Sequence, residues 1–324
     1  MGNLPLFPDT PFVVSEGLFV KPGYRGYRLP CREEGGAPSE MLLIKPIRVH
    51  DARSLAQAPT ISRMGFELVH APLDIDYGDH HSVVSRFYDH CAELVMEATG
   101  CLSARTMQHE FRVGEPISPG GAGTYAEIAH ADLTPYAEDV LAIPDGRHFG
   151  VYNVWRSTDS LQAIESKPLA MCDHSTVSAG DMISADGRRL TEPATRLVQY
   201  RLVHDTAQCW HYFPGMEPSE ALIFRQYDSR IEDPACRVTF HTAFNDPTTR
   251  DGAPRRFSVE ARVVALFAED DPAGRRSRFQ AEIPTSYPDG RLSSWRYEKM
   301  IDWGINQDPG LPAWRTPPSE SRQR

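Results

Sequence analysis

Beyond Gly100 the hydrophobic and polar positions of the chain alternate with a period of two, whereas one segment before it has helical spacing. In HSVVSRFYDHCAELVMEATG the apolar residues recur three and four positions apart, which predicts a helix with Ser82 as its N-cap and Gly100 as its end. Strands are predicted at 41–51 and 65–72 and, after the helix, in TMQHEFRVG, YAEIAHADLTP and HFGVYNVWRST and at 195–205, 209–213, 221–229, 237–244 and 256–267.

Many short strands after a single helix predict a mainly β (α+β) protein, built as a β-sandwich or jelly roll with flanking helices. The 27 prolines agree with this, because proline is tolerated at turns and not in helix interiors. We predict an irregular N-terminal arm at 1–40, one domain at 41–303 and a loosely ordered tail at 304–324. Neither GxGxxG nor GxxxxGKS/T occurs, which disfavours a nucleotide-binding fold.

The net charge of −10 argues against nucleic acid as a partner, because an acidic surface repels phosphate groups. No apolar stretch is long enough to span a membrane, and the N-terminus MGNLPLFPD lacks the pattern of a secretion signal. The six cysteines are scattered without a CxxC pair, so we interpret them as reduced thiols. Together these features predict a cytoplasmic protein.

The first candidate for chemistry is the motif His130-Ala131-Asp132. Residues two apart on a strand point the same way, so both side chains can hold one metal ion. Two histidines and one carboxylate on one face, with the other positions open, are typical of non-haem Fe(II) oxygenases. The motif alone is weakly specific, and a histidine that pairs with a nearby carboxylate is the alternative.

His241 is the preferred third iron ligand, because Arg256 and Ser258 follow it on the next predicted strand. These two share a strand face, so a guanidinium and a hydroxyl can converge on one carboxylate. A keto acid that chelates iron through one end needs such an anchor for its other end. Two further Arg-x-Ser matches, at 275–277 and 291–293, lie beyond the last predicted strand. The rival third ligands are His148, His174, His204 and His211, of which His211 is the most serious because it also lies in a predicted strand.

Three further residues are candidates for the pocket. Asn153 and Trp155 point inward on one strand, so we predict contact of Asn153 with the co-substrate and of Trp155 with the substrate, core packing being the alternative. His109 shares a predicted face with Met107 and Phe111. It is expected either to be a hydrogen-bonded core residue or to bind substrate.

Several longer runs resemble one family of oxygenases. They are IRVHDAR, MGFELVHAP, VYNVWRS, PLAMCDHSTV, YFPGMEPSEALIFRQYDS and HTAFNDPTTRDGAPRRFSVEARVVALF. The family includes the smaller subunit of the bacterial cephamycin 7α-methoxylase system, fungal gibberellin desaturase and a fungal meroterpenoid endoperoxide-forming oxygenase. The resemblance extends from about residue 41 to about residue 268.

The resemblance implies a double-stranded β-helix (a cupin-like jelly roll) that uses Fe(II), 2-oxoglutarate and dioxygen. It places the family's metal ligands at His130, Asp132 and His241 and its Arg-x-Ser pair at Arg256 and Ser258. Many members have Asn between the first two ligands, where this chain has Ala131. Members can also work as half of a heterodimer, so both a homodimer and a heterodimer stay open.

The predicted function is therefore that of an iron-dependent dioxygenase, an oxidoreductase that hydroxylates or desaturates a small secondary metabolite. The substrate is expected to be compact and largely apolar, because the residues expected to face inward, Ile128, Trp155 and Phe240, are apolar. Two alternatives are a non-catalytic or co-catalytic partner subunit of a heterodimeric oxygenase and a cupin-type metal enzyme that does not use 2-oxoglutarate.

Overall fold

A computed structural model describes residues 10–31, 37–114, 123–139, 141, 143, 146–189 and 195–294 of the chain. The tail predicted at 304–324 lies outside these residues. All six cysteines are free thiols. Among the described residues, no helix has both the length and the apolar character that crossing a membrane requires.

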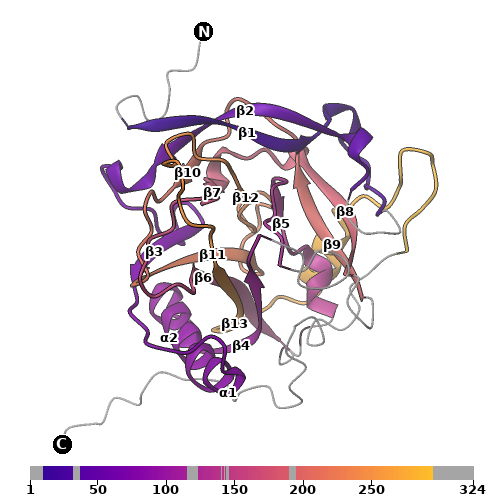
Figure 1. The fold of residues 1–324 in the computed structure, drawn as a ribbon. Helices are drawn as coiled ribbons and strands as arrows, with labels where there is room; N and C mark the ends of the chain where they lie inside the picture. The colour runs from indigo at the N-terminus through magenta and orange to yellow at the C-terminus, as the bar shows by residue number, and fades with distance from the viewer. Residues whose placement is uncertain are drawn as a thin grey trace, which may run out of the picture.

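In this described part of the chain, thirteen strands form two facing sheets (Figure 1). The eight-stranded sheet contains, in spatial order, β1 (Phe12–Val20), β2 (Leu42–Asp51), β10 (Trp210–Tyr212), β7 (Leu169–Cys172), β12 (His241–Ala243), β5 (His130–Ala131), β9 (Thr195–Leu202) and β8 (Met182–Arg189). The five-stranded sheet contains β3 (Phe66–His70), β11 (Glu220–Asp228), β6 (Arg147–Ser157), β13 (Ser258–Asp270) and β4 (Ser103–Arg112).

The chain winds between the sheets as a double-stranded β-helix. From β5 the chain passes to β6 in the opposite sheet and returns to β7 in the first. From β10 to β13 it again changes sheet at every step, so that β10 and β12 lie in the eight-stranded sheet and β11 and β13 in the five-stranded one. The hairpin of β8 and β9 is inserted after β7 and extends the eight-stranded sheet beyond β5. The predicted jelly-roll core is therefore confirmed.

The predicted helix is present and packs on the outer face of the five-stranded sheet. It runs through α1 (His80–Ser82), a π-helical turn (Val83–Phe87) and α2 (Tyr88–Thr99), and it ends at Gly100 in the left-handed conformation (φ 64°). The prediction of Ser82 as N-cap is wrong. Asp79 caps the helix, because its carboxylate accepts hydrogen bonds from the backbone N–H groups of His81 and Ser82.

The remaining helical segments are short. They are α3 (Arg275–Ala281) and the 3-10 turns Pro22–Tyr24, Ser39–Met41, Ala52–Ser54, Pro135–Asp139, His174–Thr176 and Ala179–Asp181.

The prediction of an irregular arm over residues 1–40 is wrong for the strand β1. This strand pairs antiparallel with β2 over its full length, from Phe12 opposite His50 to Val20 opposite Leu42. Its last two residues, Phe19 and Val20, are fully buried. The strand pairing and the burial are tertiary interactions, so the weak local pattern did not reveal them. The predicted strands are otherwise present, and β7 and β8 are further strands that the sequence pattern did not indicate.

Candidate active site

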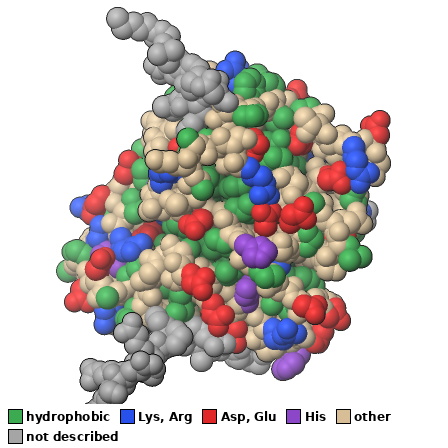
Figure 2. All heavy atoms as spheres, turned by 90° about the vertical axis from the view of Figure 1, so that its left-hand side faces the viewer, with side chains coloured by type: hydrophobic (Ala, Val, Ile, Leu, Met, Phe, Trp, Pro, Cys, Tyr) green, Lys and Arg blue, Asp and Glu red, His purple; other side chains and the backbone are tan. Residues whose placement is uncertain are grey.

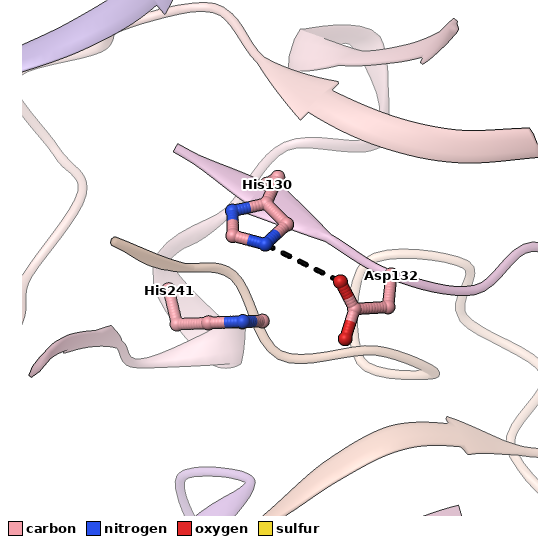
Figure 3. Close-up of side chains that lie close together, drawn as sticks. All are labelled: His130, Asp132 and His241. Atoms are coloured by element: carbon pink, nitrogen blue, oxygen red, sulfur yellow. Dashed lines mark ion pairs between the residues drawn. The ribbon is translucent and has the colours of Figure 1, made fainter. Parts of the chain in front are cut away.

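Three side chains meet between the two sheets, on the strands β5 and β12. His130 lies on β5, Asp132 directly follows it, and His241 on β12 is the antiparallel partner of His130. One ligand atom from each of the three lies within 4.8 Å of the others, and Nε2 of His130 is 3.3 Å from Oδ1 of Asp132. Figure 3 shows the two imidazoles and the carboxylate turned toward a common point. The period-two pattern and the pairing of β5 with β12 thus bring the predicted ligands together.

Both imidazoles are oriented by their own strands. Nδ1 of His130 is 2.8 Å from the carbonyl oxygen of Ile128, and Nδ1 of His241 is 3.3 Å from that of Thr239. A carbonyl oxygen only accepts hydrogen bonds, so in each ring Nδ1 carries the proton. The lone pair of each ring is therefore on Nε2, the nitrogen that a metal would bind.

The charges at this site suit a divalent metal. Burial, assisted by the neighbouring imidazole of His130, lowers the pKa of His241 to about 3, so the His241 imidazole is neutral at physiological pH. Burial alone would raise the pKa of Asp132, but the adjacent imidazole of His130 and the positive charge of Arg262 hold it well below its usual range. Two imidazoles and one ionised carboxylate are the donor set that non-haem Fe(II) takes.

The rival third ligands lie elsewhere. His211 on β10 is separated from His241 by Met171 of β7 and packs against the rings of His50 and Phe66. His148 is near Ser229, His174 is within hydrogen-bonding distance of the backbone oxygens of Arg63 and Cys236, and His204 lies against Phe19. Of the described residues, no other group of three offers ligand atoms as close together.

Arg256 and Ser258 form a buried donor pair at the start of β13. The guanidinium of Arg256 lies over the rings of Tyr125 (4.2 Å) and Trp155 (5.3 Å), and one of its nitrogens donates to the carbonyl of Lys167. Its Nε and the hydroxyl of Ser258 are buried without a hydrogen-bond partner. Burial lowers the pKa of Arg256 to about 10, so it stays protonated at neutral pH. A carboxylate would satisfy both donors.

The arginines of the two rival Arg-x-Ser matches already pair with carboxylates. Arg275, on α3, pairs with Glu232, and Arg291 is exposed and pairs with Asp289.

Asn153 and Trp155 both face the interior from β6, but they have different neighbours. The Nδ2 atom of Asn153 lies 3.5 Å from Oδ2 of Asp132, so this residue supports the candidate metal ligand. Trp155 lies beside Arg256 and belongs to the site of the predicted carboxylate anchor. The predicted contacts of Asn153 with the co-substrate and of Trp155 with the substrate stay predictions, although the position of Trp155 beside Arg256 favours contact with the co-substrate.

His109 does not face the site. A β-bulge in β4 at Met107 shifts the alternation, so Met107 packs in the core between the sheets while His109 turns toward α2. There Nδ1 of His109 is 3.0 Å from the hydroxyl of Tyr88, and the ring packs edge-on against Phe111. The geometry corrects its assignment to substrate binding, because the side chain lies on the outer side of the sheet.

Sequence reasoning missed Arg262. Its Nη2 donates to Oδ2 of Asp132 over 2.8 Å, and its Nε lies 3.5 Å from Oδ1 of Asn153. The period-two signal that selected Arg256 and Ser258 continues to residue 262, so extending it along β13 would have found this arginine.

The expectation of an apolar interior is also wrong for β4 and β13. Arg112 on β4 pairs with Glu110 over 3.0 Å and with Glu260 on β13 over 2.8 Å. These residues lie on the inner side with Arg262, because Asn153 approaches both Glu260 and Arg262. The space between the sheets therefore contains fixed charges of both signs.

Comparison with known proteins agrees with the class that the fold and the site define, a non-haem iron oxygenase. The family described as "Oxidoreductase/YMDC permease-like domain" matches residues 32–266. A hydroxylase/desaturase of Hormonema carpetanum, efuI, is 25% identical, covering 70% of this chain and 85% of the relative. The α-ketoglutarate-dependent dioxygenase tstK of Talaromyces stipitatus is 23% identical, covering 70% and 86%.

Among solved structures, the iron and α-ketoglutarate-dependent endoperoxidase NvfI has the same fold. The TM-score is 0.66 at 24% identity, covering 79% of this chain and 98% of that one. The chain belongs to the matched oxidoreductase family and is an Fe(II)- and 2-oxoglutarate-dependent oxygenase.

Proposed function

We propose that this oxygenase oxidises a C–H bond of a small organic metabolite, with iron bound by His130, Asp132 and His241. The convergence of these three ligand atoms within 4.8 Å, with both Nε2 atoms turned to the site, is the observation that carries the proposal. Three protein ligands leave room on the metal for a chelating keto acid and dioxygen. When bound, these groups supply the oxidation, in which 2-oxoglutarate is decarboxylated to succinate while the substrate is hydroxylated or desaturated.

Arg256 and Ser258 are the proposed anchor for the distal carboxylate of 2-oxoglutarate. Their unpartnered buried donors support this role, because an anion there would satisfy both of them. A guanidinium in a buried setting binds a carboxylate strongly, since little water competes. The anchor would also fix the orientation of the keto acid, so that its other end reaches the iron.

Arg262 and Asn153 have a positioning role in this proposal. They hold Oδ2 of Asp132, which leaves Oδ1, on the side of His130, as the oxygen for the metal. A ligand held in this way does not have to reorganise when the metal binds.

A small molecule is the proposed substrate, and the cytoplasm the proposed location. Figure 2 shows basic side chains scattered among acidic ones on the face drawn, where the described residues form no continuous basic patch, which disfavours a polyanion at this face. The relatives include a hydroxylase/desaturase and a biosynthesis protein, which supports a secondary metabolite. The free thiols agree with a reducing compartment.

The experiment is an anaerobic titration of the metal-free protein with Fe(II) and then 2-oxoglutarate, followed by visible absorption. We expect a weak charge-transfer band that needs both additions and is lost in His241→Ala. A band that forms equally well in His241→Ala contradicts the ligand set. Oxygen consumption that needs substrate but no 2-oxoglutarate favours the cupin-type alternative.

A further inference from the structure

Arg201 lies beside the candidate iron site on a strand outside the basic jelly-roll winding. It is on β9, in the inserted hairpin, and is the antiparallel partner of His130 on β5. Directly opposed residues of antiparallel strands point to the same face of a sheet, so Arg201 shares the inner face with His130. Gln199, two residues earlier on the same face, places its Nε2 3.5 Å from Oδ1 of Asp132. The inner face of β9 is therefore part of the site.

The guanidinium of Arg201 is buried without an anion. The residue is 9% exposed, its Nε is buried and lacks a hydrogen-bond partner, and no carboxylate of the described residues forms an ion pair with it. Burial lowers its pKa to about 10, an effect that the negative charge of Asp132 partly offsets, so the side chain is charged at neutral pH. A buried charge without a partner is unfavourable, so this position favours an anion from outside the chain.

The other interior arginines at the site have assigned partners. Arg262 pairs with Asp132, and Arg112 pairs with Glu110 and Glu260. In the proposed function Arg256 takes the distal carboxylate of 2-oxoglutarate. The negative charge of Asp132 is already shared with Arg262 and would be shared with the metal, so it does not neutralise Arg201.

We propose that Arg201 binds an acidic group of the primary substrate, which makes the substrate an organic acid. This inference rests on the proposed function, because it requires the neighbouring site to hold iron and 2-oxoglutarate. Arg201 lies one strand from His130, so a carboxylate held there would place the adjoining carbon skeleton near the metal. The guanidinium fork suits a carboxylate, which it can bind through two parallel hydrogen bonds.

The test compares acids with their uncharged amides in binding to the loaded protein. Calorimetry is done anaerobically with Mn(II) in place of Fe(II) and with saturating 2-oxoglutarate, so that the iron position and Arg256 are already occupied. The probes are benzoate and octanoate, each against its primary amide. We expect the acids to bind more tightly than the amides to the unmodified protein, and Arg201→Gln to weaken acid binding by roughly 30-fold or more without weakening amide binding.

Two variants make the result specific. Arg196→Gln removes an exposed arginine of the same strand and should leave the preference for acids intact. Arg201→Lys keeps the positive charge and should retain part of the preference for acids. Acids that bind no better than amides, or a preference that survives in Arg201→Gln, overturn the proposal.

A loss of 2-oxoglutarate binding in Arg201→Gln, with the acid preference unchanged, also overturns it and assigns Arg201 to the co-substrate. Failure of the proposed function would give a different result. Arg256→Gln would then leave 2-oxoglutarate binding unchanged, whether or not the protein binds acids more tightly than amides.

Discussion

Arg262 donates a 2.8 Å hydrogen bond from Nη2 to Oδ2 of Asp132, while Oδ1 of the same carboxylate lies 3.3 Å from Nε2 of His130. Oδ2 of Asp132 thus contacts the fixed cation Arg262, and Oδ1 faces the candidate metal position. The ion pair is largely buried, with side-chain exposures of 11% and 10%, so solvent screens it little.

Arg262→Gln should therefore weaken Fe(II) binding by roughly 10- to 100-fold, because Asp132 loses the group that orients it. Arg262→Lys should retain part of the affinity. The measurement is an anaerobic Fe(II) titration of the purified variants. An affinity equal to that of the unmodified protein would show that Asp132 is positioned without this arginine.

Arg256→Ala should raise the requirement for 2-oxoglutarate while iron binding stays nearly unchanged. Removing one partner of a buried charge pair costs about 3–5 kcal/mol, which corresponds to a rise of roughly 100-fold or more in Kd. The adjacent Arg255 is exposed, so Arg255→Ala is the matched control and should change little. Titration of the iron-loaded protein with 2-oxoglutarate checks both variants, and equal affinities would remove Arg256 as the anchor.

His109→Leu should lower stability and leave the reaction intact, because this side chain faces α2 and not the site. The hydroxyl of Tyr88 loses its contact with the imidazole, which costs about 1–3 kcal/mol. Urea unfolding gives the free energy of unfolding, and Tyr88→Phe is the companion variant. A changed KM for substrate with unchanged stability would show that His109 contributes to the substrate pocket.

Acid should destabilise the metal-free protein in part through His211. Burial, with the positive charge of His50, lowers its pKa to about 3, from 6.5. As the pH falls below about 6.5, the unfolded chain takes up a proton at His211 that the folded protein does not, so stability falls by up to about 1.4 kcal/mol per pH unit.

His211→Leu should remove this contribution. The free energy of unfolding of the metal-free variant should then fall less steeply between about pH 6.5 and about pH 5 than that of the unmodified protein. Equal slopes for the two proteins would show that the imidazole is not held neutral by the fold.

Those parts of the candidate site that depend on short sequence spacings were predictable. The His-x-Asp and Arg-x-Ser spacings follow from strand alternation, and the same alternation predicted most strands. His241 was placed by its position before Arg256, and the structure pairs it with His130 across two strands.

Other features depend on contacts that no local pattern contains. The bulge at Met107 reverses the direction of His109, and β1 forms through its pairing with β2. Arg262 reaches a carboxylate 130 positions away in the sequence. The proposed role of Arg201 depends on the inserted hairpin, which joins the sheet at β5. The pairing of Arg201 with His130 follows from the strand order, which no local sequence pattern contains.

The most direct test of the iron site is anomalous diffraction at the iron edge, from crystals grown anaerobically with Fe(II) and 2-oxoglutarate. We expect one iron peak roughly 2.0–2.3 Å from Nε2 of His130, Nε2 of His241 and a carboxylate oxygen of Asp132, with the distal carboxylate of 2-oxoglutarate at Arg256 and Ser258. An iron peak beside His50 and His211, or a keto acid bound away from Arg256, would contradict the account.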